Sequence, residues 1–167
     1  MPLRHRDIET ITVLGIAERM GPVAFMIYAE HHLAAAQSAQ LPDTRETTIF
    51  SPAGTFLTCR TVELALKAFL SLKGISMAQM ADGPGAHNLE RLLLQADNLA
   101  LGEFAVLSQE QRSIIIRASK YYSEKVLEYP AVGEAFPSYP GWPNSAEMLC
   151  VAETLIAALR QPCREAK

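Results

Sequence analysis

The stretch FLTCRTVELALKAFLSLKG, residues 56–74, decides the fold. Its segment 57–72 is predicted to be one α-helix stopped by Gly74, because a turn of about 100° per residue spreads its apolar residues over most of the circumference. A helix that is apolar on nearly every side packs against several neighbours, as the central helix of a bundle does. The apolar positions are Leu57, Cys59, Val62, Leu64, Ala65, Leu66, Ala68, Phe69, Leu70 and Leu72.

The same helix carries one narrow polar strip, formed by Arg60, Glu63, Lys67 and Ser71. Either the strip faces water through a gap between neighbouring helices, or it lines a small polar cleft inside the bundle. Glu63 and Lys67 are spaced and ordered for an ion pair, which stabilises an exposed helix by only about 0.2–0.5 kcal/mol. We expect the strip to be partly enclosed, with the Glu63 carboxylate bonded to Lys67 and His87.

Four other segments show helical spacing of apolar residues: 22–41, a segment starting near residue 88, 108–128, and 144 to the residue before Pro162. Segment 7–20 is ambiguous, because its β-branched residues and a glycine weaken its helical pattern.

Capping signals support two of these helices. Ser108 and Gln111 have the spacing of a capping box, and Asn144 with Glu147 resembles a second one. Pro162 is expected to end the last helix.

The connections between these helices are rich in turn-forming residues. They span 42–55, 74–86 and 129–143, and we find no strand, hairpin, internal repeat or second domain. The sequence therefore predicts an all-α, single-domain bundle of five or six helices across residues 1–167. Its up-and-down core covers about 22–160, with two long loops.

Composition narrows the function only a little. The chain has a formal net charge of −3 and an apolar content of 49%, as globular proteins do. A protein that grips phosphate backbones usually has a basic surplus, so nucleic acid is a disfavoured partner here, although a local basic patch stays open.

Cysteine usage and hydropathy bear on the compartment. Cys59, Cys150 and Cys163 are odd in number, widely spaced and free of any CxxC pair, which is typical of reduced thiols. No apolar run approaches the roughly 20 residues that span a bilayer, and no signal-type apolar region follows the basic N-terminus. We expect a soluble, cytoplasmic protein without a membrane segment.

Two stretches together resemble a known family. VELALKAFLSLKG (62–74) and AHNLERLLLQA (86–96) are similar to the HEPN-like bundles, which are related to the substrate-binding subunits of small nucleotidyltransferases. The resemblance extends over about 58–130. The matching positions are Glu63, Leu64, Leu66, Lys67 and Ala68 in the first helix, His87, Leu89 and Leu92 in the second with Asn88 at an acidic position, and Tyr129-Pro130 with Glu128 in place of an arginine.

The resemblance implies a bundle of four or five helices, often a homodimer, in toxin–antitoxin, defence or nucleotide-related systems. Ribonuclease members carry an arginine followed four to six residues later by a histidine. The four histidines here, His5, His31, His32 and His87, do not have that spacing. We therefore expect a non-catalytic module, without a cofactor, that binds a partner protein or a small nucleotide-like ligand. The alternative is an enzyme of unassigned chemistry with Glu63, Lys67 and His87 at its centre.

His87 has two readings within this hypothesis. Paired with Glu63 it could act as a general base, or it could simply lock two helices together, which we favour. His31-His32 is not expected to bind metal, because adjacent helical side chains point about 100° apart and no HExxH motif is present.

The third connection is aromatic as well as proline-rich. Tyr129, Phe136, Tyr139 and Trp142 could form a lid over a ligand or a surface for a partner. A rigid plug at one end of the bundle is the arrangement we favour.

Overall fold

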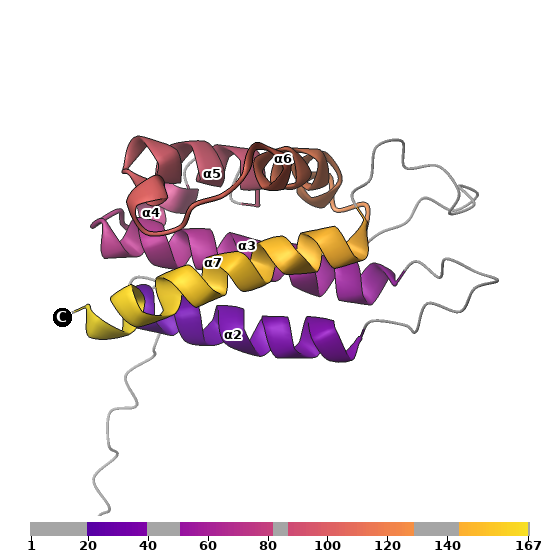
Figure 1. Cartoon of the computed structure of the whole chain (residues 1–167), viewed down its shortest axis with the longest axis horizontal. Coiled ribbons are helices and arrows are strands. Elements are labelled where there is room, and N and C mark those ends of the chain that lie inside the picture. The colour runs from indigo at the N-terminus through magenta and orange to yellow at the C-terminus, as the bar shows by residue number, and fades with distance from the viewer. Residues whose placement is uncertain (1–19, 40–50, 82–86, 129–143, 167) are drawn as a thin grey trace, which may run out of the picture.

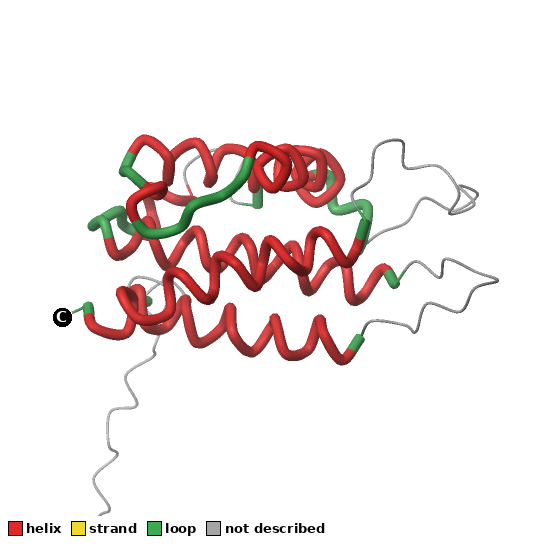
Figure 2. Tube along the Cα trace, in the orientation of Figure 1, coloured by secondary structure: helices red, strands yellow, loops and turns green. Residues whose placement is uncertain are grey.

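The computed structural model describes the chain in four ranges: 20–39, 51–81, 87–128 and 144–166. Within them the chain is all-helical, and no strand is present, as the sequence predicted (Figure 2). The ambiguous segment 7–20 lies outside these ranges except for its last residue, and the aromatic loop lies outside them entirely. The elements are α2 (Pro22–Ser38), α3 (Pro52–Leu72), α4 (Met77–Ala81), α5 (Leu89–Asn98), the 3₁₀-helix η1 (Leu101–Glu103), α6 (Gln109–Ser123) and α7 (Ser145–Glu165).

Helix α3 is the centre of the bundle, as its apolar circumference predicted. It contacts α2, α5, α6 and α7. Helix α2 lies at one edge of the bundle and α5 and α6 at the opposite edge, with α3 and α7 between them (Figure 1). Within the polar strip of α3, Glu63 and Lys67 are buried between helices, whereas Arg60 and Ser71 stay partly exposed. Among the described helices, none has both the length and the apolar composition of a membrane span.

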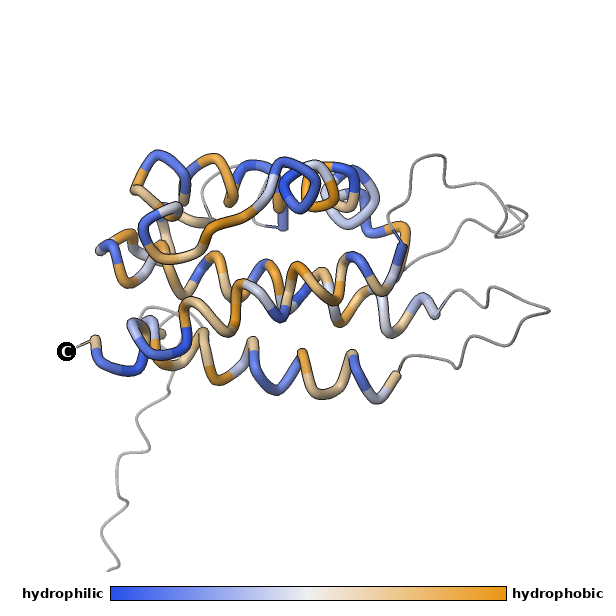
Figure 3. Tube along the Cα trace, viewed as in Figure 1, coloured by the Kyte–Doolittle hydropathy of each residue, from blue (hydrophilic) through white to orange (hydrophobic). Residues whose placement is uncertain are grey.

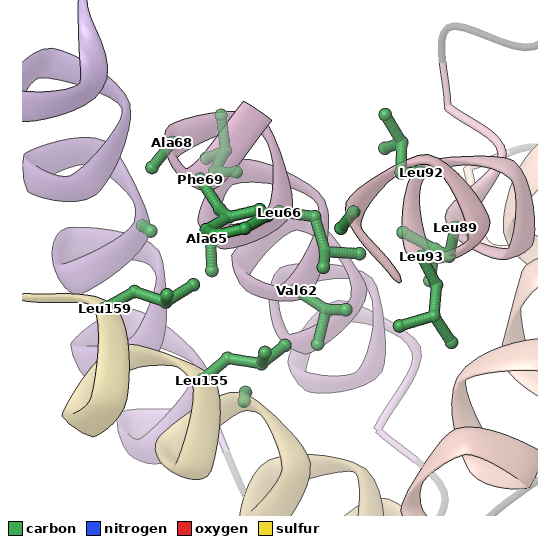
Figure 4. Close-up of a cluster of buried hydrophobic side chains, with 14 of the residues drawn as sticks. Val62, Ala65, Leu66, Ala68, Phe69, Leu89, Leu92, Leu93, Leu155 and Leu159 are labelled. Atoms are coloured by element: carbon green, nitrogen blue, oxygen red, sulfur yellow. The ribbon is translucent and has the colours of Figure 1, made fainter. Parts of the chain in front are cut away.

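The core forms where three helices meet. Side chains of α3 pack between leucines of α7 on one side and leucines of α5 on the other (Figure 4). Figure 3 shows hydrophobic positions along α3 and α7, with hydrophilic ones interspersed in α3. Each fully buried leucine or phenylalanine contributes about 1.5–3 kcal/mol. The labelled residues of this cluster are Val62, Ala65, Leu66, Ala68, Phe69, Leu89, Leu92, Leu93, Leu155 and Leu159.

Helix α3 begins earlier than predicted, so the expected loop 42–55 is wrong at its C-terminal end. The Ser51 side chain accepts a hydrogen bond of 3.1 Å from the Gly54 amide and caps the helix. Pro52 occupies the first turn, where its missing N–H costs nothing. Residues 52–55 therefore belong to the helix.

The connection 74–86 was predicted to lack regular structure, and this is also wrong, because it contains α4. The Ser76 amide donates to Gln79 Oε1 (2.8 Å) and the Gln79 amide donates to Ser76 Oγ (3.3 Å). These reciprocal bonds are those of a capping box. Met80 is buried and fixes the short helix against the core.

Helix α6 starts at the predicted capping box but ends sooner than expected. Ser108 and Gln111 exchange bonds of 2.9 and 3.1 Å, which confirms the predicted start. The helix ends at Ser123 rather than near Glu128, because Lys125 adopts a left-handed conformation with φ of 57°.

The predicted start of α7 at Asn144 is confirmed, but the predicted capping box and the predicted stop at Pro162 are wrong. Asn144 caps the helix through a 2.7 Å bond from the Ala146 amide, and Glu147 does not complete a box. At the other end the helix continues through Pro162 to Glu165. The buried Cys163 adds one more apolar contact beyond the proline, which favours this extra turn.

Candidate functional site

The strongest polar feature is a carboxylate buried in the middle of α3. The Glu63 side chain is 0% exposed, and four side chains donate hydrogen bonds to it. We call these five residues the Glu63 cluster: Arg60, Glu63 and Lys67 of α3, His87 just before α5, and Tyr122 of α6.

Helical spacing supplies two of the donors. Lys67 lies one turn after Glu63, and its Nζ donates to Oε1 at 2.6 Å. Arg60 lies one turn before, and its Nη1 donates to Oε2 at 2.8 Å. The pair predicted between Glu63 and Lys67 is therefore present, but inside the bundle rather than on its surface.

The other donors come from neighbouring helices. His87 Nδ1 lies 3.2 Å from Glu63 Oε2, and the Tyr122 hydroxyl donates to the same oxygen at 2.6 Å. Because a carboxylate only accepts, the His87 contact assigns the ring proton to Nδ1. Arg60 Nη1 is also 3.4 Å from that nitrogen. The contact predicted between Glu63 and His87 is thus observed.

The start of α5 holds His87 in place. The Asn88 side chain caps this helix by accepting from the Arg91 amide at 2.9 Å. Ser119 of α6 donates to the same Asn88 oxygen at 3.1 Å and accepts from the Glu90 amide. These bonds fix α5 to α6 directly beside His87, which also packs edge-on against Tyr122.

Exposure divides the cluster into an inner and an outer part. Glu63 is fully buried and the Lys67 side chain is only 8% exposed, whereas Arg60 and His87 are 30% and 46% exposed. Arg60 and Lys67 carry two positive charges against one negative charge on Glu63. The cluster therefore has a surplus positive charge, and its outer part, which we call the Arg60–His87 edge, consists of a cation and an imidazole.

The cluster strongly favours ionised Glu63. Burial alone would raise the pKa of the carboxyl, but the His87 hydrogen bond and the Lys67 and Arg60 charges lower it to about 2. The Tyr122 pKa is raised by burial and then by the Glu63 charge, so its hydroxyl stays a donor. Burial alone would lower the Arg60 pKa, but the Glu63 charge raises it.

The sequence interpretation missed one member of the cluster, and one residue of the polar strip lies outside it. Tyr122 was assigned to the apolar core of its helix, although a buried tyrosine hydroxyl usually needs a partner. Ser71, the last residue of the predicted strip, is partly exposed and lies one turn beyond Lys67, outside the cluster.

The sequence analysis considered two further features as possible sites, the His31-His32 pair and the aromatic loop. His31 is exposed, and His32 Nδ1 contacts the Tyr28 carbonyl at 2.8 Å, as a residue one turn away can. Among the described residues, no three histidine, cysteine or acidic side chains are grouped to hold a metal ion. Tyr129, Phe136, Tyr139 and Trp142 lie outside the described ranges.

The cysteines differ in exposure. Cys59 and Cys163 are buried, and Cys150 is exposed. The Cys59 pKa is raised by burial and then by the Glu63 charge, and burial raises the Cys163 pKa to about 11. Neither buried thiol is therefore a ready nucleophile.

Comparison of the chain with models of protein families, with curated proteins and with solved structures gives no match. The function of the chain is therefore inferred from these distances and charges.

Proposed function

We propose that this protein is a non-catalytic, HEPN-like binding module that holds a small phosphate-bearing, nucleotide-like ligand at the Arg60–His87 edge. The observation that carries the proposal is the uneven exposure of the Glu63 cluster. Its carboxylate is buried and its surplus positive charge reaches the surface through Arg60, beside the half-exposed His87.

The geometry of Arg60 suits a phosphate group. A guanidinium has five N–H donors in a plane that matches phosphate or carboxylate oxygens. The hydrogen bond that Arg60 donates to Glu63 uses Nη1, so most of its N–H donors lie outside this bond. Glu63 therefore positions Arg60, and the exposed side of the guanidinium can receive an anion. His87 adds a second donor there when it is protonated.

The state of Glu63 supports a binding role over proton transfer. A general base works best when its pKa lies near the working pH. Glu63 has a pKa of about 2 and accepts four hydrogen bonds, so it is a weak proton acceptor at neutral pH.

The alternative is an enzyme in which His87 is the base. The 3.2 Å contact from His87 Nδ1 to Glu63 favours it, because a carboxylate at one ring nitrogen orients the other toward a substrate. Against it, no serine, threonine or cysteine among the described residues hydrogen-bonds to His87.

Calorimetric titration with AMP, inorganic phosphate and adenosine tests the proposal. We expect AMP and phosphate to bind and adenosine not to, with Arg60→Gln weakening AMP binding at least about tenfold. Arg160→Gln is the matched control, because Arg160 also shares a carboxylate, Glu30, with a second cation, Arg164.

Three results would count against the proposal. They are no binding of either phosphate compound, an equal loss in the Arg160→Gln control, or undiminished binding by Arg60→Gln. Turnover of AMP that His87→Ala abolishes would instead support the enzyme alternative.

A further inference from the structure

Two members of the Glu63 cluster, Tyr122 and His87, belong to a group of three aromatic rings in contact. The Tyr122 ring centroid is 5.9 Å from that of Phe56 and 6.2 Å from that of His87. Tyr122 is only 3% exposed, whereas Phe56 is partly exposed and the His87 side chain is 46% exposed. The aromatic rings therefore extend from the Arg60–His87 edge to Phe56 on α3.

Phe56 lies on the same side of α3 as Arg60. The two residues are four positions apart, and side chains at this spacing are neighbours on a helix. Their backbone positions are about 6 Å apart along the helix axis at 1.5 Å per residue. Both side chains are partly exposed. An aromatic ring and a cation are thus presented together, one turn apart.

The incomplete burial of Phe56 distinguishes it from two other phenylalanines of the bundle. Phe25 and Phe69 are 2% and 0% exposed, whereas Phe56 packs against the core only in part. Its ring is tilted by 49° against the Tyr122 ring, so the two rings are not stacked face to face. Part of an aromatic surface is therefore left for a ligand to cover.

An exposed aromatic ring beside a cation is complementary to a ligand that has a planar ring and a negatively charged group. Aromatic side chains bind nucleobases by stacking, and any base can stack because every base has a flat π-face. We propose that Phe56 stacks on the base of the ligand, so that this site selects nucleoside monophosphates over sugar phosphates. This inference rests on the proposed function, because it requires Arg60 to hold the phosphate group.

The spacing of the two groups fits such a ligand. In a nucleoside 5′-monophosphate one ribose separates the base from the phosphate, a length comparable with the roughly 6 Å between Phe56 and Arg60 along α3. A sugar phosphate could contact Arg60 but would leave the Phe56 ring in water.

Glu63 positions both parts of this site. It accepts a hydrogen bond from Arg60 Nη1 at 2.8 Å and another from the Tyr122 hydroxyl at 2.6 Å. The Tyr122 ring in turn packs beside Phe56. One buried carboxylate therefore fixes the cation directly and the aromatic ring through its neighbour.

Calorimetric titration with AMP and ribose 5-phosphate tests the inference, because both carry a phosphate on a ribose and only AMP carries a base. We expect AMP to bind the unaltered protein at least about fivefold more tightly. Phe56→Leu removes the ring and keeps an apolar side chain. It should weaken AMP binding at least about fivefold and leave ribose 5-phosphate binding unchanged. Phe56→Tyr keeps the ring and should retain the AMP affinity.

Phe104→Leu is the matched control. Phe104 is also a partly buried phenylalanine beside a cation, because Lys73 Nζ lies 4.5 Å from its ring centroid. It packs against Phe69, which is about 20 Å further along α3 than Phe56 at 1.5 Å per residue. The control should leave both affinities unchanged, and melting curves without ligand should show that each variant is folded.

A measurement on the unaltered protein tests the contact without any substitution. Nuclear Overhauser effects should connect the base protons of bound AMP with the ring protons of Phe56. Effects to the Phe104 ring instead, or none to any phenylalanine ring at saturating AMP, would overturn the inference.

The two ligands separate the inference from the proposed function. Equal affinities for AMP and ribose 5-phosphate would overturn the role of Phe56 and leave the phosphate site at Arg60 in place. Undiminished AMP binding by Phe56→Leu, or an equal loss in Phe104→Leu, would have the same meaning. Binding of neither ligand would overturn both proposals.

Discussion

Replacing Glu63 by glutamine tests how far the Glu63 cluster stabilises the fold. The substitution keeps the shape of the side chain and removes its charge. Lys67, whose side chain is 8% exposed, would then carry a buried charge without its carboxylate 2.6 Å away. Breaking a buried ion pair by removing one partner costs about 3–5 kcal/mol, far more than the 0–1 kcal/mol of a surface pair. We expect a loss of about 3–5 kcal/mol in the free energy of unfolding.

Urea unfolding of three proteins makes the measurement. Glu153→Gln is the matched control, since Glu153 is exposed in the middle of α7 and bonds to the neutral Gln37. The same chemical change there should alter stability by less than about 0.5 kcal/mol.

A double substitution separates the charge effect from other causes. Glu63→Gln combined with Lys67→Met removes the uncompensated cation. The double variant should therefore lose less free energy of unfolding than the sum of the losses in the two single variants. A cost below about 1 kcal/mol for Glu63→Gln, or strictly additive losses, would refute a buried, charge-dependent cluster.

Three further predictions follow from the same contacts. The Glu63 pKa is lowered from 4.5 to about 2 in the folded chain, so the ionised carboxylate contributes fully to the free energy of unfolding above pH 4.5. This contribution, about 3 kcal/mol, is lost as the pH falls through about 2, and a comparison with Glu63→Gln over this pH range should show the loss. Tyr122→Phe removes the 2.6 Å bond to Glu63 and should cost about 1.5–3 kcal/mol by urea unfolding, as a bond to a charged group does; a loss below about 0.5 kcal/mol would contradict this. A thiol reagent should modify only Cys150 in the folded chain, because Cys59 and Cys163 are buried; rapid reaction of all three thiols would show that the core is open.

The sequence predicted the central helix and the partial enclosure of its polar strip. Because segment 57–72 is apolar on nearly all sides, it needs neighbouring helices on nearly all sides. Its charged strip therefore had to lie in a polar cleft among those helices or face water through a gap between them. Helical spacing also predicted the pair between Glu63 and Lys67. The contact to His87 was an inference across two helices, and it depended on how the connection before α5 folds.

Other features were present in the sequence but were read incorrectly. Ser76 and Gln79 have the same capping-box spacing as Ser108 and Gln111, yet the nearby Gly83-Pro84-Gly85 led to the prediction of a loop. Pro162 was taken as a stop, although a proline near the end of a helix breaks few hydrogen bonds.

Tyr122 could not be placed in the cluster by periodicity. Spacing along α6 shows that this residue faces inward, but not which atom its hydroxyl meets. That depends on the packing of α6 against α3, which brings together residues 59 positions apart in the chain.

The most direct test of the proposed function is an NMR titration with AMP that follows the arginine side-chain N–H and histidine ring signals. We predict saturable shifts of the Arg60 and His87 signals and none for Arg160 and Arg164, two exposed arginines that both pair with Glu30. Shifts of equal size at all four residues would mean non-specific attraction to positive charge. Unchanged Arg60 and His87 signals at saturating AMP would contradict the proposal that this edge holds a phosphate-bearing ligand.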